Sequence, residues 1–330
     1  MKEKYGSFVV SLDFELFWGV QDNKSVEKYY DNLHGVHSAV PRILEEFRKH
    51  KIHATWATVG FLFFNSKDEL IAFLPDRMPG YINTKLSPYR HLSSIKSDNK
   101  DNSIYFAKEL VKEISKSTNQ EIGSHTFSHY YCNEEGQNIG EFSSDLQAFI
   151  NSSKDINLNV SSLVFPRNQV NVDYLSICSE FGITSYRGNQ DTWLYKDDNS
   201  NDSLFKRLFR LTDSYVNLSG YNTYILSKPF DSMPLNIPAS QFLRPYSNYL
   251  KYFDYFKLRR IKKSMTYAAK TGRIYHLWWH PHNFGINLKD NMTFLIKILE
   301  HYLFLKNKYG MQSLNMNEIY CRYSSVKNKE

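Results

Sequence analysis

Cysteine is scarce in this sequence of 330 residues, which contains only Cys132, Cys178 and Cys321. The three are odd in number, lie far apart and form no C-x-x-C pair, so they do not indicate a disulfide framework. Unpaired thiols are typical of a reducing compartment. We therefore expect three free cysteines and a cytoplasmic protein.

Long hydrophobic runs are also missing. No segment reaches the length of about 20 apolar residues that a membrane-spanning helix needs. The first residues meet a charge at Asp13 before an apolar segment of signal-peptide length can form, which again favours the cytoplasm. RNP-type, zinc-finger and basic-zipper patterns are absent, so we expect no nucleic-acid partner.

Aromatic residues and positive charge are abundant by contrast. The chain has 24 tyrosines, 23 phenylalanines and five tryptophans, and 42% of its residues are hydrophobic, enough for a large core. Aromatic faces also suit the apolar faces of sugar rings and membrane interfaces. Lysine and arginine outnumber aspartate and glutamate by 41 to 34, a net charge of +7 that favours anionic partners.

Short apolar runs of strand type alternate with helical periodicity along most of the chain, which predicts an α/β fold. We expect one catalytic domain over residues 1–330, with irregular insertions at about 75–102 and 196–252. Strands are predicted at 8–12, 53–60, 121–123, 161–165, 183–186, 273–279 and 312–315, and helices at 34–50, 66–74, 105–115, 146–150, 174–181, 204–211, 258–268 and 292–303.

Polar side chains follow several of these predicted strands. Asp13 and Glu15 end the first strand, and alternation places both carboxylates on one side. His125 and His129 follow the third strand, and the run 276–285 places more histidines after a later one. Since ligands bind at the carboxyl ends of parallel strands, we expect these residues to share one site.

The histidine spacing suggests a metal site. His125 and His129 are separated by three residues, which allows two imidazoles to bind one ion. Thr126 stands where a zincin metalloprotease has glutamate, so that class is disfavoured. The acid ligand is then Asp13 or Glu15, with the other carboxylate free to act as a base.

Five ordered motifs resemble the polysaccharide deacetylase family, the carbohydrate esterases with the nodulation-type deacetylase fold. The resemblance spans residues 11–285 and is carried by Asp13 and Glu15, by the H-T-x-x-H run from His125 to His129, and by the segments 165–168, 191–193 and 277–280. It implies an irregular (β/α) barrel of fewer than eight regular units. It also implies a divalent metal, Zn²⁺ or alternatively Co²⁺, Ni²⁺ or Mn²⁺, and removal of N-acetyl groups from sugars.

The resemblance also implies a role for each matching residue. Glu15, His125 and His129 would be the metal ligands, Asp13 the base and His280 the acid. Arg167 would orient Asp13, and Asp191 would orient His280. We further assign Arg187, Trp193, Trp278 and His282 to substrate binding.

Three departures from the family pattern leave alternatives open. An acidic pair is usually adjacent but is here Asp13-Phe14-Glu15, so base and ligand are exchangeable. The usual R-x-P order is here Pro166-Arg167, which makes Arg187 an alternative for orienting the base. Asp191 rests on a partial match, and a backbone carbonyl is the alternative partner of His280.

The expected function is thus metal-dependent deacetylation of an N-acetylated sugar during assembly of a bacterial capsule or lipopolysaccharide side chain. The positive charge and the aromatic stretch 246–263 suggest a sugar on an anionic nucleotide or lipid carrier, or a nascent glycan, with peripheral attraction to the inner membrane surface. The alternatives are a catalytically silent glycan-binding scaffold and an amidohydrolase acting on a non-sugar C–N bond.

Overall fold

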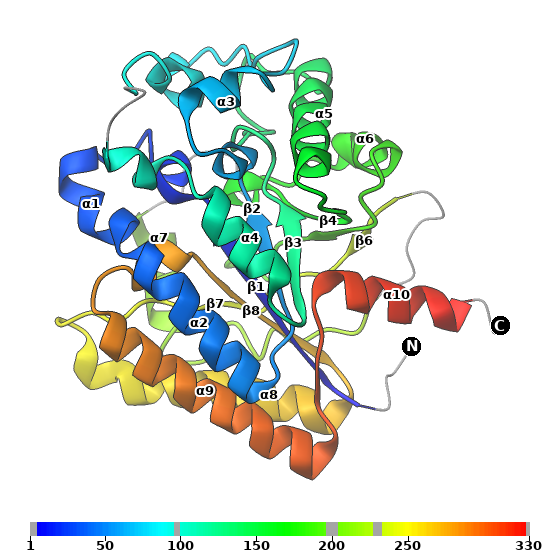
Figure 1. The fold of residues 1–330 in the computed structure, drawn as a ribbon. Helices are drawn as coiled ribbons and strands as arrows, with labels where there is room; N and C mark the ends of the chain where they lie inside the picture. The colour runs from blue at the N-terminus through cyan, green and yellow to red at the C-terminus, as the bar shows by residue number, and fades with distance from the viewer. Residues whose placement is uncertain (1–4, 96–99, 196–203, 227–232, 328–330) are drawn as a thin grey trace.

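The computed structural model describes residues 5–95, 100–195, 204–226 and 233–327. Its centre is one parallel sheet, strongly curled and surrounded by helices (Figure 1). In space the strands follow the order β6-β5-β4-β3-β2-β1-β8-β7, and β9 pairs with β1. The strands are β1 (Ser7–Phe14), β2 (Ala54–Thr58), β3 (Gln120–Ser124), β4 (Ser162–Val164), β5 (Ser185–Arg187), β6 (Leu235–Asn236), β7 (Gln241–Phe242), β8 (Ile274–Trp279) and β9 (Gln312–Ser313).

One segment joins the two edges of this sheet. The amide of Ala239 donates to the carbonyl of Gly188, beyond β5, while the next amide, Ser240, donates to the carbonyl of His276 in β8. β6 pairs with β5 and β7 pairs with β8. The segment 235–243 therefore closes the curled sheet into the irregular barrel predicted from the sequence.

Helices cover the outside of the sheet, with α2 packed on α9 and α9 on α8 (Figure 1). The α-helices are α1 (Val26–His34), α2 (Val36–His50), α3 (Lys67–Ile71), α4 (Lys108–Lys116), α5 (Ile139–Asp155), α6 (Leu175–Glu180), α7 (Leu204–Asp213), α8 (Asp254–Thr271), α9 (Leu288–Tyr309) and α10 (Met316–Lys327). Short 3₁₀ helices are η1 (Leu16–Gly19), η2 (Gly60–Phe63), η3 (Thr84–Leu86), η4 (Pro88–His91), η5 (Lys100–Ile104), η6 (Pro166–Asn168), η7 (Val172–Tyr174), η8 (Lys251–Phe253) and η9 (Pro281–Phe284).

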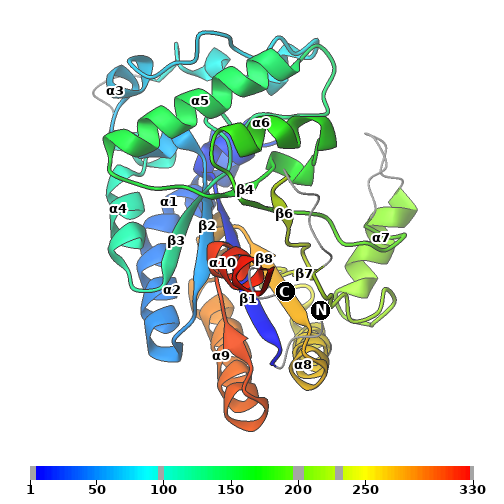
Figure 2. The same cartoon turned by 90° about the vertical axis from the view of Figure 1, so that its right-hand side faces the viewer.

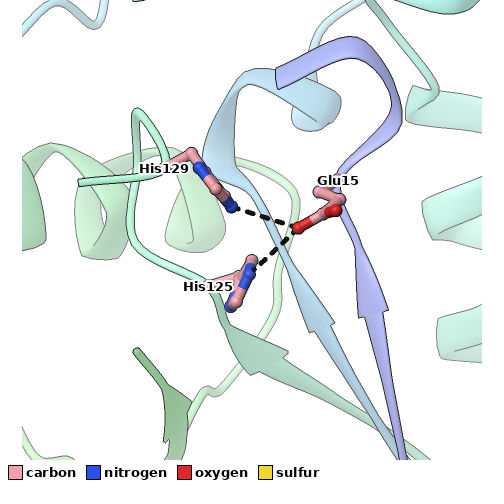
Figure 3. Close-up of side chains that lie close together, drawn as sticks. All are labelled: Glu15, His125 and His129. Atoms are coloured by element: carbon pink, nitrogen blue, oxygen red, sulfur yellow. Dashed lines mark hydrogen bonds and ion pairs between the residues drawn. The ribbon is translucent and has the colours of Figure 1, made fainter. Parts of the chain in front are cut away.

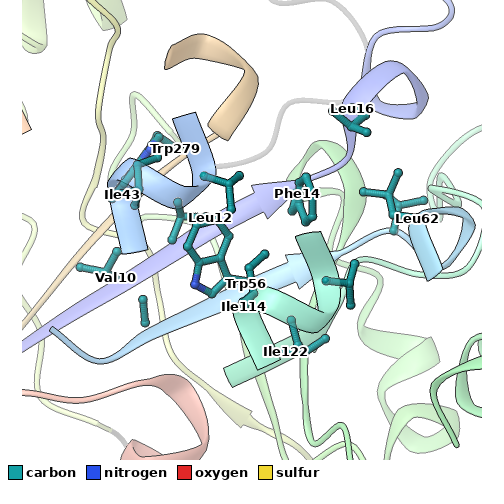
Figure 4. Packing of buried hydrophobic residues seen from close by; sticks show 14 of the residues in the cluster. Val10, Leu12, Phe14, Leu16, Ile43, Trp56, Leu62, Ile114, Ile122 and Trp279 are labelled. Carbon is teal, nitrogen blue, oxygen red and sulfur yellow. The ribbon is translucent and has the colours of Figure 1, made fainter. Parts of the chain in front are cut away.

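Both faces of β1 are buried, because a sheet enclosed by helices must be apolar outside and filled inside. Val10, Leu12 and Phe14 pack outward against helix side chains such as Ile43 of α2 (Figure 4). The alternate residues point into the barrel, where Ser11 accepts a hydrogen bond from Arg187. The inner face of β1 thus carries polar residues toward its carboxyl end.

The opposite end of the barrel is closed by α10, a helix that the sequence did not predict. Figure 2 shows α10 in front of the strands. Met316 and Ile319 of this helix pack with Val9 and other buried apolar residues. The amide of Met316 donates to Oγ1 of Thr55 at the start of β2. Since α10 fills the end where the strands begin, the open mouth lies at their carboxyl ends.

The range 196–252, which the sequence suggested to be an insertion, contributes β6 and β7 to the sheet and is therefore part of the barrel. Its predicted helical run is present as α7, and residues 196–203 and 227–232 lie outside the described part. Over 75–102, only short 3₁₀ turns occur in the described residues. Among all described residues, no helix is long and apolar enough to cross a membrane.

Candidate functional site

The predicted site residues meet at the carboxyl ends of the strands. Asp13 is the penultimate residue of β1 and Glu15 follows it, while His125 follows β3 and His280 follows β8. β1 lies between β2 and β8, and β2 pairs with β3. Strand order therefore brings together residues that are up to 267 positions apart in the sequence.

Glu15 lies against both histidines of the H-T-x-x-H run. Its Oε2 atom is 3.3 Å from Nε2 of His125 and 3.1 Å from Nε2 of His129, and all three side chains are buried (Figure 3). Burial raises the pKa of Glu15, but His280, His125 and His129 lower it well below its usual value. Burial lowers the pKa of His129, although Glu15 opposes the shift. The group therefore combines an ionised carboxylate with a neutral imidazole.

This donor set fits a divalent metal. The Nδ1–H of His125 donates to the carbonyl of Val164 over 2.8 Å, which leaves the lone pair on Nε2. That Nε2 atom is buried and has no hydrogen-bond donor. A backbone carbonyl that fixes the tautomer of a histidine is the usual support of a metal ligand. Glu15, His125 and His129 could thus hold one ion.

The position of Glu15 depends on a glycine. A Cβ atom at Gly19, in the last turn of η1, would lie 2.0 Å from the carboxyl carbon of Glu15. Only a residue without a side chain leaves room for the carboxylate at this place. η1 therefore forms a cradle for the acid of the group.

Asp145, which the sequence analysis did not select, holds the histidine loop in place. Its carboxylate accepts hydrogen bonds from the amides of Phe127 and Ser128 and from the Ser128 hydroxyl. Thr126 and His129 have φ angles of 61° and 60°, a strained conformation for residues with side chains. A carboxylate on the buried face of α5, between Phe142 and Phe149, was the sequence signal for this support.

Asp13 forms a buried ion pair with Arg187, the alternative that the sequence had left open. Both carboxylate oxygens accept from Arg187 over 2.7 Å, and Arg187 Nη2 also donates to Oδ1 of Asn168. Burial raises the pKa of Asp13, but Arg187 and His125 lower it by more, so it lies below its usual value. Asp13 is accordingly ionised and held in one orientation.

Arg167 lies elsewhere. It forms an ion pair with Asp22, and its guanidinium carbon is 4.3 Å from the centre of the Tyr131 ring. Arg167 and Asn168 have φ angles of 55° and 54°, so the turn in η6 directs Asn168 to Arg187 and Arg167 away from Asp13. The contact predicted for Arg167 is thus made by Arg187.

His280 and His282 flank Glu15 on the side opposite the histidine loop. Nε2 of His280 is 3.5 Å from Oε1 of Glu15 and 3.8 Å from Oδ2 of Asp13. Nδ1 of His282 is 3.9 Å from Oε1 of Glu15, and burial lowers the pKa of His282 to about 3. The backbone of Gly285 packs directly on Gly35, where a Cβ would lie 2.1 Å from the Gly285 carbonyl oxygen, and this contact fixes the loop.

The remaining predicted residues divide into two groups. Trp278 lines the mouth, and its ring lies 4.2 Å from the guanidinium carbon of Arg187. Asp191 and Trp193 are exposed, and Trp193, at 64% exposure, packs on Phe209 of α7. The Nδ1 atom of His280 lies 3.4 Å from the side-chain nitrogen Nδ2 of Asn283.

Solved structures with the same fold include polysaccharide deacetylases. A Mycobacterium smegmatis protein assigned to this group shares 12% identity, with 98% of this chain and 92% of that chain covered and a TM-score of 0.60. A Pseudomonas aeruginosa protein assigned likewise shares 11% identity over 96% and 89% of the two chains, with a TM-score of 0.54. The allantoinase PuuE has a TM-score of 0.54 at 12% identity, covering 97% and 89%.

At these identities the likeness shows the fold alone. A search of curated proteins found no match. The family model for polysaccharide deacetylase, however, matches residues 19–186, a little over half of the chain. The five motifs, the barrel and this match lead to one conclusion: the chain belongs to the polysaccharide deacetylase family.

Proposed function

We propose that the protein is a metal-dependent deacetylase that hydrolyses the N-acetyl group of a sugar. The observation that carries the proposal is the arrangement around Glu15, with His125 and His129 on one side and His280 on the other. Glu15, His125 and His129 would hold the ion, Zn²⁺ by its preference for nitrogen and carboxylate ligands. When bound, such an ion polarises an acetyl carbonyl and makes water more acidic.

Asp13 and His280 carry the proton transfers in this proposal. Asp13 is ionised and held by Arg187, so it can accept the proton of the attacking water. His280 is partly exposed at the mouth and can donate a proton to the departing amine. Nε2 of His280 and Oδ2 of Asp13 are 3.8 Å apart, so both can act on one small acetyl group.

The wall beside His280 is suited to a sugar ring. Phe242 and Trp278 have ring centres 4.7 Å apart, and Phe242 lies 5.7 Å from His280. Aromatic faces stack on the apolar faces of sugars, while Asn168, Asn189 and Gln190 offer hydrogen bonds to hydroxyl groups. Trp278 is thus the aromatic residue that we assign to the substrate.

We further propose that the substrate is met inside a bacterial cell, on an anionic nucleotide or lipid carrier, during assembly of a surface polysaccharide. All three cysteines are free, which suits a reducing compartment. The net charge of +7 favours an anionic partner.

Peripheral attraction to the inner membrane surface is supported by a basic, aromatic surface on η8 and α8. Tyr249, Tyr252 and Tyr255 are 93%, 80% and 67% exposed. A groove beside them is lined by Arg259, Lys262, Lys263 and Lys270, among others. Exposed aromatic rings with basic residues are suited to an interface with anionic headgroups.

The test is acetate release by metal-loaded protein from N-acetyl sugars linked to a nucleotide or lipid diphosphate, compared with release from chitin or peptidoglycan. We expect preference for the carrier-linked sugars. Asp13→Asn and His280→Ala should each lose about a hundred- to ten-thousand-fold in kcat while keeping the metal. Absence of acetate release from every N-acetyl sugar would leave a silent glycan-binding protein or a hydrolase of non-sugar C–N bonds.

A further inference from the structure

A cavity of about 390 Å³ extends from the catalytic residues toward α7 and has a strongly basic lining. His280 and Trp278 form its end at the site, and three arginines, Arg167, Arg210 and Arg244, also line it. Arg167 is paired with Asp22. The other two lie beyond the aromatic wall, in α7 and two residues after β7.

Arg244 is a half-buried cation without an acidic partner. Its Nε atom donates to Oγ of Ser214 over 2.7 Å, and no carboxylate among the described residues forms an ion pair with it. Burial lowers the pKa of Arg244, and only the tyrosines Tyr195 and Tyr215 oppose the shift. The nearby acid Asp213 is bound by Arg260 over 2.7 Å and is not available.

A half-buried charge without an acidic partner costs free energy, because it loses part of its water shell and no opposite charge compensates for the loss. An anionic ligand in the cavity would supply the missing partner. Lys257, which donates to the carbonyl of Arg244, adds positive charge behind it, although Asp254 pairs with that lysine over 2.8 Å.

The same cavity contains an unsatisfied hydrogen-bond donor. The amide nitrogen Nε2 of Gln241 is buried and has no hydrogen-bond partner, while Oε1 of this side chain accepts from Tyr275 over 2.9 Å. Gln241 lies three residues before Arg244 and lines the cavity with it. An amide donor without an acceptor and a guanidinium without an acidic partner are a complementary set for an oxyanion.

We propose that this cavity binds a phosphate or diphosphate group attached to the sugar, with Arg244 as its main contact. The proposal rests on the proposed function, since it places the N-acetyl group beside Asp13 and His280 and the charged group of the substrate beyond Phe242. A guanidinium recognises phosphate through two parallel hydrogen bonds, which a buried, oriented arginine is prepared to form. The substrate class is therefore a glycosyl phosphate or diphosphate, and not a neutral glycan.

The direct test measures binding of inorganic pyrophosphate to the metal-loaded protein by calorimetry, which does not depend on deacetylation. We expect Arg244→Gln to weaken binding about 10- to 100-fold, the effect of one charge-assisted contact. Arg48→Gln is the matched control, because Arg48 is exposed in the last turn of α2 and its loss removes the same charge. Equal affinities of the wild type and Arg244→Gln, or no binding by the wild type, would overturn the proposal.

Two further measurements test whether a change in pyrophosphate affinity is due to Arg244. Binding that survives in His125→Ala/His129→Ala shows that the metal is not the pyrophosphate site, and binding lost there overturns the proposal. If Arg244→Gln does not fold, pyrophosphate binding is measured with Arg244→Lys instead, since lysine keeps the charge but not the paired hydrogen bonds. Its affinity should fall about threefold or more, and unchanged affinity would contradict the role of Arg244.

Kinetics identify the source of the anion. Acetate release is compared for an N-acetylhexosamine 1-phosphate, a nucleoside diphosphate N-acetylhexosamine and an N-acetylated disaccharide with a uronate. Arg244→Gln should lower kcat/KM for the phosphorylated substrates relative to the uronate at least tenfold. A larger loss on the uronate would overturn the phosphate assignment. Failure of the wild type to release acetate would refute the proposed function. The pyrophosphate measurement would still test whether the cavity binds an anion.

Discussion

The two carboxylates at the end of β1 are two residues apart and interact with different kinds of side chain. Glu15 is surrounded by imidazoles, whereas Asp13 is held by a guanidinium. Imidazoles leave the oxygens of Glu15 available to share an ion, but Arg187 occupies both oxygens of Asp13. On this difference we base the proposal that Glu15 is the metal ligand and Asp13 the base, two roles that the sequence had left exchangeable.

The largest effect is expected at the histidine side. His125→Ala/His129→Ala should reduce the metal content from about one ion per chain to nearly none and abolish acetate release, because a single carboxylate cannot retain the ion. Metal analysis of protein purified without added metal measures this. His34→Ala, at an exposed histidine of α1, is the control. Full metal content in the double variant would move the site to Glu15, His280 and His282, the other group with suitable spacing.

The cradle of Glu15 provides a test that leaves every proposed ligand intact. Gly19→Ala places a methyl group where the carboxylate now lies, so Glu15 must shift. We expect metal binding about 10- to 100-fold weaker, as for changes to residues that support ligands. Competition with a chelator measures the affinity. Gly182→Ala is a control for inserting a methyl group, since nothing lies within 4 Å of it, although its φ of 82° adds strain. Wild-type affinity in Gly19→Ala would remove η1 from the site.

The arginine side is tested by comparing Arg187→Met with Arg167→Met. Arg187→Met leaves the buried carboxylate of Asp13 without its partner, which should cost about 3–5 kcal/mol in the free energy of unfolding. Arg167→Met breaks a pair whose arginine side chain is 31% exposed to water, so its cost should be smaller than that of Arg187→Met. Urea unfolding of both variants gives the two values. Similar costs would show that Arg187 is not the special partner of Asp13.

The last prediction concerns the pH dependence of stability and involves His276, which forms a hydrogen bond with Ser11 inside the barrel. Burial and then Arg187 lower its pKa to about 3, against an ordinary value near 6.5. The unfolded chain therefore binds a proton below pH 6.5 that the folded protein does not, so stability falls as the pH falls. The loss from this residue should be about 2 kcal/mol between pH 6.5 and 5.

His276→Gln removes this contribution. Its free energy of unfolding, although lower at neutral pH, should decline less between pH 7.5 and 5 than that of the wild type. Urea titrations at pH 7.5, 6 and 5 measure the two slopes. Parallel slopes would mean that His276 is protonated in the folded protein.

The sequence predicted the site best where its residues lie close together in the chain. His125 and His129 lie on one loop, and Asp13 and Glu15 end one strand, so spacing and strand order predicted their meeting. The alternation of strands and helices predicted an α/β fold, and the family resemblance implied the barrel. The family resemblance supplied a role for each residue, and these roles stay predictions.

The sequence could not predict which distant partner a side chain takes. Arg167 lies in the motif, yet the turn at Arg167 and Asn168 directs it to Asp22, and Arg187 reaches Asp13 from the next strand. β6 and β7 have two residues each, too short to show periodicity. The contacts of Arg244 and Asp145 likewise depend on tertiary packing, which local patterns do not contain.

The position of β1 in the sheet also constrains how the protein folds. β1 is the first strand of the chain, but it pairs with β8 and β9. The residues of these two strands lie more than 260 positions after their partners in β1. Bringing such distant segments together slows folding, because the entropy of closing a large loop is lost before the contacts form. On the ribosome, Asp13 and Glu15 would remain beside an unpaired strand edge until residue 279 has emerged, so the site is among the last parts of the barrel to be completed.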